Sequence, residues 1–247
     1  MNSIKPIIPQ SFLPGKIVCG FTSRSGGVSS VPFDTLNCGL NTPDKEANVL
    51  RNHALVYNFA EVEKENVALM GQVHGSHVEI VGSGGIYRET DALITSKPGL
   101  MLCIQVADCV PLLLNDPVRN IIAAVHCGWK PITSGIAEKC VQIMTEEFSV
   151  KPESILAAIG PSAGKCCYEV GLDVAEHLKP EAICKHDSRL HADLKKELWL
   201  RLVDTGLIAQ HIDVSNECTI CNEGLFYSYR RDGIQSGRML GFIKMKK

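Results

Sequence analysis

His74, Cys109 and His126 lie at positions where metal or nucleophilic chemistry could occur. The stretch GQVHGSHV, residues 71–78, sets His74 and His77 three positions apart between glycines, beside an expected strand. Such histidines could bind a metal ion, act as bases or occupy a polar turn. Cys109 and His126 each lie at a break in or end of an apolar run, where loops commonly carry reactive groups. With His74 they make a Cys-His-His set, which suits Zn²⁺ with one position left for water.

The spacing of this set is wide, so spacing alone supports it weakly. A single histidine or cysteine at the end of a strand is more typical of a satisfied polar residue or a small core side chain. The chain has eleven cysteines and no recognisable secretion signal, which favours reduced thiols over a disulfide framework. Some of these thiols could be metal ligands.

Four other cysteines give weaker signals. Cys218 and Cys221 have the spacing of a metal or redox pair, but no second pair of that spacing and no thioredoxin-like pattern accompany them. The adjacent Cys166 and Cys167 lie in a turn flanked by glycine, where small side chains permit close packing. We interpret the first two as ordinary reduced thiols and the second two as structural or pocket-lining residues.

The elements that must position these groups are mostly short strands. Runs rich in β-branched and apolar residues predict five strands within fifty residues, followed by a sixth. These runs are residues 77–81, 91–95, 100–106, 110–114, 121–126 and 155–159. The clustering of strands, without strict strand–helix alternation, predicts an α+β fold rather than a doubly wound sheet.

Three helices are expected among the strands. The first begins at Thr42-Pro43-Asp44, as cap, first-turn proline and acid. Thr133 or Ser134 caps the second, and the third spans residues 191–206. Their apolar stripes are, in order, Ala47, Leu50, Ala54 and Tyr57; Ile136, Cys140, Met144 and Phe148; and Leu194, Leu198 and Leu202. The stretch LFYSYRRDGIQSGRMLGFI near the end predicts two strands around a glycine-rich turn.

Composition limits the class of protein. The chain has 247 residues, of which 45% are hydrophobic and 21% are charged, and it contains no repeat, low-complexity tract or linker. These values predict one globular domain over residues 1–247. The net charge of −2 offers no basic surplus for nucleic acid. The first residues lack the pattern of a signal peptide, and polar residues interrupt the apolar stretch 100–114, so we expect a cytoplasmic protein without a membrane partner.

Five stretches of the chain together resemble a known family. They are TSRSGGVS, GQVHGSHV, VADCVPLLL, AAVHCGWK and IGPSAGKCCYEVG, followed near the end by CTICNEGLFYSYRRDGIQSGR. In this order they are similar to the YfiH family, also called the laccase-domain or purine nucleoside phosphorylase family. The resemblance covers nearly the whole chain. It implies a layered sandwich of mixed β-sheets flanked by helices, and a zinc site at His74, Cys109 and His126.

The resemblance also implies a function and its partners. The expected substrates are purine nucleosides and phosphate: phosphorolysis of adenosine, inosine and methylthioadenosine, and deamination of adenosine. His77, which begins a strand, then becomes an orienting or exposed residue rather than a ligand. The sequence ranks none of these nucleosides above another and leaves the oligomeric state open.

The two reactions make different chemical demands. Deamination needs water activated by zinc, which lowers the pKa of bound water to about 7, and a carboxylate that carries a proton to the leaving ammonia. Asp108 or Glu169 could carry it, although Asp108 could equally orient a ligand or cap a turn. Phosphorolysis needs an anion held beside the ribose. Candidate contacts are Arg24, Lys130, Arg230, Arg231 and Arg238.

Among these basic residues, Arg24 is the favoured anion contact. It lies in TSRSGGVS, where small neighbours let backbone amides approach a phosphate together with the guanidinium. The competing interpretation is that Arg24 ties down a surface loop. Measurement of phosphate dependence in a variant of this residue separates the two.

Three other functions are alternatives to a zinc-dependent nucleoside enzyme. A metal-free cysteine hydrolase would use Cys109 as catalytic nucleophile and His126 or His74 as its base. A copper phenol oxidase would bind copper through one Cys and two His, although a multicopper cluster needs more histidines than the eight present. A binding module without enzymatic activity would turn over no nucleoside.

Two positions depart from the family's pattern. Pro131 follows Lys130 where a glycine is usual, and proline lacks a backbone N–H. This position therefore cannot donate a backbone hydrogen bond to substrate. Asn52 is followed by His53 rather than arginine, so a guanidinium that could hold an anion or form an ion pair is missing.

Overall fold

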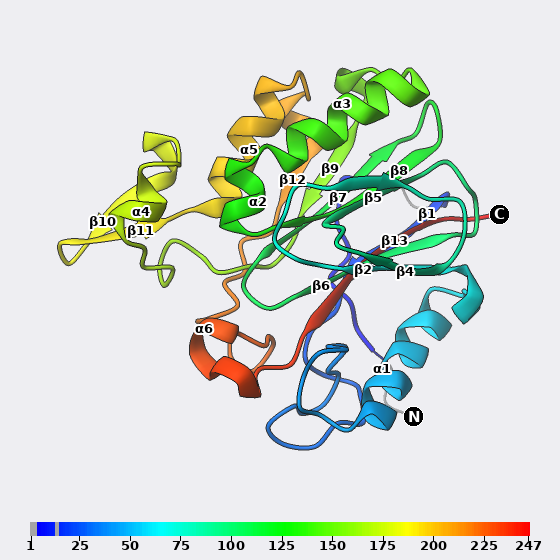
Figure 1. Cartoon of the computed structure of the whole chain (residues 1–247), viewed down its shortest axis with the longest axis horizontal. Helices are drawn as coiled ribbons and strands as arrows, with labels where there is room; N and C mark the ends of the chain where they lie inside the picture. Colours follow the sequence, from blue (N-terminus) through cyan, green and yellow to red (C-terminus); the bar gives the residue numbers. More distant parts are fainter. Residues whose placement is uncertain (1–3, 13–14) are drawn as a thin grey trace.

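Two mixed β-sheets packed face to face form the centre of the molecule. In the computed structural model, which describes residues 4–12 and 15–247, the strands form a five-stranded sheet, a six-stranded sheet and a separate hairpin (Figure 1). The five-stranded sheet runs in the order β1 (Ile17–Phe21), β13 (Met239–Met245), β6 (Met101–Val106), β2 (Val67–Gly71) and β4 (Gly85–Arg88). In it, β2 is parallel to β4 and β6, whereas β13 is antiparallel to β1 and β6.

The six-stranded sheet carries most of the strands predicted from the sequence. Its order is β12 (Ile212–Val214), β9 (Leu156–Ile159), β7 (Val110–Asp116), β8 (Ile121–Cys127), β5 (Ala92–Thr95) and β3 (Val78–Ile80). The central strands β7 and β8 are antiparallel, as are β7 with β9 and β5 with β8. The edge pairs β12 with β9 and β3 with β5 are parallel.

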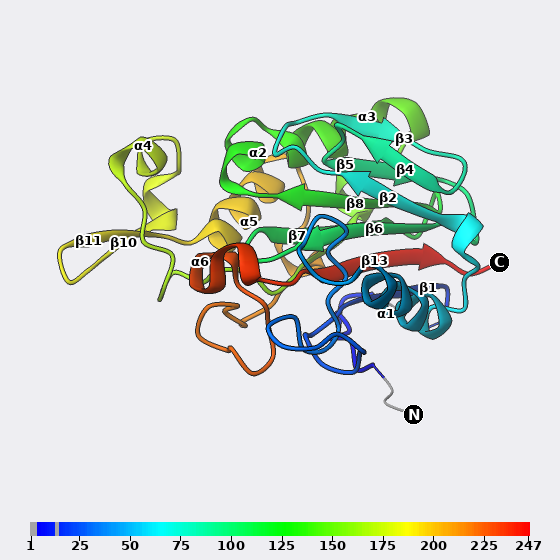
Figure 2. The same ribbon diagram turned by 60° about the horizontal axis from the view of Figure 1, so that its bottom comes forward.

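Helices cover the outer faces of the two sheets. The helices are α1 (Glu46–Phe59), α2 (Trp129–Thr133), α3 (Ile136–Phe148), α4 (Leu172–Ala175), α5 (Leu194–Asp204) and α6 (Tyr229–Asp232). Figure 2 shows α3 and α5 on the six-stranded sheet and α1 on the opposite side of the molecule. The hairpin of β10 (Ile183–His186) and β11 (Arg189–Ala192) projects to one side beside α4.

Alternation along the central strands builds three apolar layers. In β8, Ala123 and Val125 pack with α3 and α5, whereas Ile122 and Ala124 face the space between the sheets. The third cluster joins α1 to the outer face of the five-stranded sheet. Because successive side chains on a strand point to opposite faces, the strands β5, β7, β8 and β9 each contribute to two layers. The predicted α+β sandwich of mixed sheets flanked by helices is therefore confirmed.

The first helix begins later than predicted, and a different face is buried. Asp44 accepts hydrogen bonds from Ser29 and Asn37, so the polar residues before the helix hold the preceding loop, and α1 begins at Glu46. Its buried face is Val49, Asn52, His53, Val56 and Tyr57, whereas Ala47, Leu50 and Ala54 are exposed. A face that buries hydrogen-bonded polar residues is invisible to a hydrophobic pattern.

The C-terminal segment was predicted wrongly as two strands. Residues 229–232 form α6 and 233–235 a 3₁₀ turn, so only β13 is a strand. Ser228 caps α6 by accepting the amide of Arg231, and Gly233 ends it at a φ of 59°. The cap of α3 also differs, because Gly135 rather than Thr133 or Ser134 precedes it.

Candidate metal centre and the pocket around it

The three expected ligands meet where the two sheets end. Cys109 directly precedes β7, and His126 is near the end of the neighbouring β8, opposite Pro111 in the strand pairing. His126 continues the face of β8 that lies between the sheets, two residues after Ala124. His74 comes from the loop between β2 and β3. Strand pairing thus brings together residues that are far apart in the sequence.

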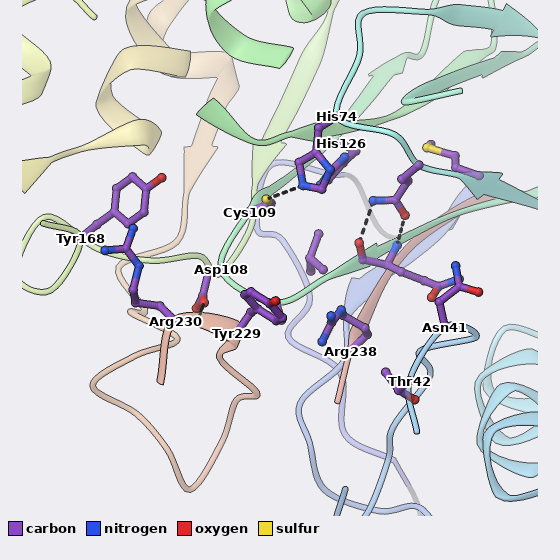
Figure 3. Close-up of a pocket in the computed structure, with 15 residues that line it drawn as sticks. Asn41, Thr42, His74, Asp108, Cys109, His126, Tyr168, Tyr229, Arg230 and Arg238 are labelled. Carbon is purple, nitrogen blue, oxygen red and sulfur yellow. Dashed lines mark hydrogen bonds between the residues drawn. The ribbon is translucent and has the colours of Figure 1, made fainter. Parts of the chain in front are cut away.

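The side chains are close enough to bind one metal ion. One ligand atom from each of His74, Cys109 and His126 lies within 4.8 Å of the other two. Cys109 Sγ is 3.7 Å from His74 Nε2, and the two imidazole rings are 4.7 Å apart in an edge-to-face arrangement (Figure 3). Gly128 makes room for them, because a Cβ there would lie 3.1 Å from Cys109 Sγ and 3.2 Å from the His74 ring. His77 is exposed and is not part of this group.

Asp91 positions both histidines. Asp91 directly precedes β5, which pairs with β8. Its Oδ1 lies 2.7 Å from His126 Nδ1. Its carboxylate also accepts the backbone amides of Val73, His74 and Gly75. These bonds hold the loop that carries His74, whose φ of 58° is left-handed. With Nδ1 of His126 engaged by the carboxylate, Nε2 is the nitrogen left for a metal.

Interactions among Cys109, His126 and Asp91 outweigh the effect of burial on their pKa values. Burial disfavours the thiolate of Cys109, but attraction to His126 and hydrogen bonds from His126 and His74 outweigh it and lower its pKa to about 6. Burial likewise disfavours protonated His126, but the Cys109 thiolate and Asp91 raise its pKa to about 9. Asp91 is buried too, yet its bonds to His126 and to the backbone amides lower its pKa. The thiolate needed by a metal is therefore stabilised at neutral pH.

A pocket of about 560 Å³ opens above these residues. Figure 3 shows Tyr168 and Arg230 on one side, Asn41 and Thr42 on the other, and the Cys-His-His group between them. The remaining lining residues are Met70, Gln72, Gln105, Val106, Ala107, Asp108, Tyr229 and Arg238. This volume and its mixture of aromatic, amide and charged side chains are typical of a small-molecule site.

Two arginines stack on tyrosines in the pocket wall. The guanidinium of Arg230 lies 4.9 Å from the ring centre of Tyr168, and that of Arg238 lies 5.4 Å from that of Tyr229. Arg230 also donates to the carbonyl oxygen of Glu169, and Arg238 donates to the carbonyls of residues 236 and 237. Stacking and carbonyl contacts fix both cations at the pocket without neutralising them.

Asp108 lines the pocket with both carboxylate oxygens already bonded. Oδ1 accepts Thr219 Oγ1 at 2.6 Å, and Oδ2 accepts Ser228 Oγ at 3.0 Å and the backbone amide of Arg230 at 2.7 Å. Its φ of 79° is left-handed. Asp108, which directly precedes Cys109, therefore anchors the start of α6 and Arg230 beside the Cys-His-His group. Of the roles expected for Asp108, these contacts favour positioning over proton transfer.

Three other expected site residues lie off the pocket wall. Arg24 donates to Asp34 and to the carbonyl of Glu223, and its guanidinium lies 4.9 Å from the ring centre of Tyr227. The geometry thus favours the loop-holding role for Arg24 over the anion contact. The carboxylate of Glu169 pairs with Arg189, and the ammonium of Lys130 lies over the ring of Trp129. None of the three lines the pocket in the described part of the chain.

The two departures from the family's pattern have structural explanations. The imidazole of buried His53 bonds to the carbonyl of Cys38 and to Tyr57, away from the pocket. Pro131 lies in the first turn of α2, where an N–H would have no partner within the helix. Arg231, another candidate contact for the phosphate anion, instead holds the loop before α6 in place. Its guanidinium donates to the carbonyls of Thr219, Ile220 and Phe226.

The donor set fits a single metal ion with an open position. One thiolate and two imidazoles are ligands for Zn²⁺ or copper, and three protein ligands are characteristic of catalytic zinc sites. The carboxylate on His126 Nδ1 is the partner that metal-bound histidines usually have. A multicopper cluster would need ligands for further ions beside these three.

These features define the class of the protein: an α+β sandwich with a Cys-His-His group at the open end of its two sheets. Residues 18–246 match the family described as multi-copper polyphenol oxidoreductase laccase. The chain belongs to this family, which includes YfiH and YlmD proteins.

Individual relatives are similar over nearly their whole length. Purine nucleoside phosphorylase YlmD of Bacillus subtilis is 35% identical, over 94% of this chain and 90% of the relative. Purine nucleoside phosphorylase YfiH of Escherichia coli is 32% identical, over 97% and 98%. The crystal structure of YlmD from Geobacillus stearothermophilus superposes with a TM-score of 0.90 at 32% identity, over 95% and 94% of the two chains.

The helices give no indication of a membrane span. Across residues 4–12 and 15–247, none is both long enough and apolar enough to cross a bilayer.

Proposed function

We propose that this protein is a zinc-dependent purine nucleoside phosphorylase that also deaminates adenosine. Its phosphorolysis substrates are adenosine, inosine and methylthioadenosine, which yield the free base and ribose 1-phosphate or its methylthio analogue. Deamination converts adenosine and water to inosine and ammonia. The observation that carries the proposal is an open Cys-His-His group facing a pocket whose wall holds two arginines. The names of the relatives support the nucleoside as substrate.

His74, Cys109 and His126 would hold the zinc. When bound, zinc supplies Lewis acidity and lowers the pKa of coordinated water. Asp91 keeps His126 oriented, with Nε2 toward the pocket, and holds the His74 loop through three backbone amides. Because Asp91 is buried and hydrogen-bonded, this orientation exists before substrate enters, and pre-organisation of this kind lowers the barrier to reaction.

Arg230 and Arg238 are the proposed phosphate contacts. Both line the pocket, and guanidinium groups bind phosphate oxygens in a fixed geometry. The rings of Tyr168 and Tyr229 offer apolar faces for a purine or a ribose, and Asn41 on the opposite side offers an amide to a base edge. Asp108 positions Arg230 through its backbone amide.

Arg230→Ala should raise the KM for phosphate roughly 10–100-fold, the value of a lost charge-assisted hydrogen bond. Zinc content and adenosine deamination should change little, because neither needs phosphate. Chromatographic measurement of adenine, hypoxanthine and inosine over a phosphate titration separates the two reactions.

Arg24→Ala is the matched control for this substitution. Both arginines stack on a tyrosine at 4.9 Å, but only Arg230 lines the pocket. Arg24→Ala should lower thermal stability and leave the KM for phosphate unchanged. If the KM rises with Arg24→Ala and not with Arg230→Ala, the anion contact has been assigned to the wrong arginine.

Asp108→Asn tests positioning against proton transfer. Asparagine keeps one acceptor oxygen for the three donors that Asp108 now serves, so α6 and Arg230 should shift. We expect a several-fold higher KM for phosphate, unchanged zinc and a kcat within about tenfold of the parent. A kcat for deamination lower by roughly 10²–10⁴, with KM unchanged, would instead identify a proton carrier.

A metal-free cysteine hydrolase is the second candidate, favoured by one observation. The pKa of Cys109 is lowered to about 6 beside His126, whose pKa is raised, and such a pair could serve as nucleophile and acid. Removal of zinc separates the two functions. The hydrolase would keep its activity after chelation, whereas the phosphorylase would lose it and regain it with added zinc.

A further inference from the structure

A second group of metal-binding side chains lies outside the pocket. Cys166 and Cys167 follow β9, and Cys218 and Cys221 follow β12. One sulfur from each lies within 4.8 Å of the other three. Cys221 Sγ is 3.3 Å from Cys166 Sγ and 3.1 Å from Cys167 Sγ. The adjacent cysteines thus form the second pair that the spacing of Cys218 and Cys221 lacked in the sequence.

The two loops are built to bring these sulfurs together. Ser162 and Cys218 form a parallel bridge that extends the pairing of β9 with β12, and the amide of Thr219 donates to the carbonyl of Ser162. The amide of Gly164 donates to Cys218 Sγ at 3.2 Å. A Cβ on Gly164 would lie 3.1 Å from Cys218 Cβ and 3.3 Å from Cys166 Sγ, so glycine permits this approach.

We propose that Cys166, Cys167, Cys218 and Cys221 bind a second zinc ion as four thiolates. Tetrahedral Zn–S bonds of about 2.3 Å separate the sulfurs by about 3.8 Å, which is compatible with the contacts in this group. Four thiolates in contact repel one another, so a cation is needed to stabilise them together. Soft thiolate ligands select zinc over calcium, magnesium or manganese, and four protein ligands make a closed structural site.

The arrangement favours a metal over a disulfide. A disulfide joins two sulfurs, yet Cys221 contacts both Cys166 and Cys167, and all four cysteines are free. A cluster of several iron ions would need thiolates spread more widely around it. One ion uses all four ligands.

The second zinc would fasten two loops that support one wall of the pocket. Tyr168, next to Cys167, stacks on Arg230, and Thr219, next to Cys218, donates to Asp108. Arg231 ties the carbonyls of Thr219 and Ile220 to the same wall. This consequence rests on the proposed function of the pocket, whereas the binding of the ion does not.

Elemental analysis of purified variants tests the site without reference to activity. The parent protein should carry about two zinc ions per chain. Cys166→Ser with Cys221→Ser should leave one, as should His74→Ala with His126→Ala, and all four changes together should leave none. Cys184→Ser, at a cysteine in the β10–β11 hairpin, should leave two. One zinc in the parent, unchanged by the two cysteine substitutions, would overturn the proposal.

The His74→Ala, His126→Ala variant identifies the ligands with all four cysteines intact. Zinc X-ray absorption should show sulfur neighbours alone, at about 2.3 Å. A metal-free variant, or zinc with nitrogen or oxygen neighbours, would contradict the four-thiolate site even where the cysteine variants fail to fold. A mass lower by two hydrogens under non-reducing conditions would show a disulfide instead. If the parent protein binds zinc at the four cysteines but none in the pocket, the proposed function is refuted and the four-thiolate site is not.

Discussion

Cys109→Ser should remove the pocket zinc and lower turnover of adenosine by roughly 10³-fold, the value of several kcal/mol of metal assistance. A serine hydroxyl is a poor zinc ligand, whereas the Cys109 thiol is ionised near neutral pH because His126 and His74 stabilise the thiolate against its burial. The two histidines that remain bind zinc too weakly to hold it through purification. Zinc content and product formation are measured on the same preparation.

Cys127→Ala is the control for this change. Cys127 lies next to His126 on β8, but its side chain packs in the cluster between the sheet and the helices. Its loss should cost some stability and leave zinc and turnover unchanged. Full zinc in the Cys109 variant would show that this cysteine is not a ligand. Lost turnover with zinc retained would favour the nucleophile of a cysteine hydrolase.

Asp91→Asn should weaken zinc binding in the pocket by about 10–100-fold, as expected for loss of the group that orients a metal-bound histidine. The carboxylate serves His126 and three backbone amides of the His74 loop at once, so both ligands lose their support. Activity should recover with excess zinc, because Asp91 itself contacts no substrate. Zinc affinity is measured by competition with a chelator.

Asp116→Asn provides the matched control for Asp91→Asn. Asp116 is also buried on the six-stranded sheet and accepts a backbone amide, from Arg119, and the hydroxyl of Ser154. Its replacement should reduce stability without changing zinc affinity. Equal zinc affinity in the Asp91 variant and the parent would remove Asp91 from the metal centre.

The sequence predicts strands well where their apolar runs are continuous. The expected strands at residues 100–106, 110–114 and 121–126 agree with β6, β7 and β8 to within about two residues. Edge strands such as β4 and β12 were missed, because exposed or short strands carry little apolar signal. The helical start of the C-terminal segment was missed because its cap depends on Ser228 and Asp108, which meet only in the folded chain.

The candidate site was only partly predictable. His74, Cys109 and His126 were expected together, and the fold places them together. Asp91 was seen only as the start of a strand, because nothing in its neighbourhood of the sequence indicates that it faces two histidines. Arg24 looked like an anion contact among small residues, but the fold supplies Asp34 as its partner. Contacts between distant loops decide such roles.

The four-cysteine group shows the same limit. The spacing of Cys218 and Cys221 marks them as a pair, but nothing in the spacing connects the adjacent Cys166 and Cys167 to it. The pairing of β9 with β12 brings the two loops together, and β12 was absent from the predicted elements. A pair of neighbouring cysteines with a distant CxxC pair is the signal that could have found the group.

Product analysis of zinc-defined protein tests the central claim most directly. Protein depleted of metal and protein restored with zinc are each incubated with adenosine, with and without phosphate. The proposal predicts adenine and ribose 1-phosphate only with zinc and phosphate together, and inosine with zinc in either case. Equal product formation by the metal-depleted protein, or adenine release that does not depend on phosphate, would contradict a zinc-dependent phosphorylase.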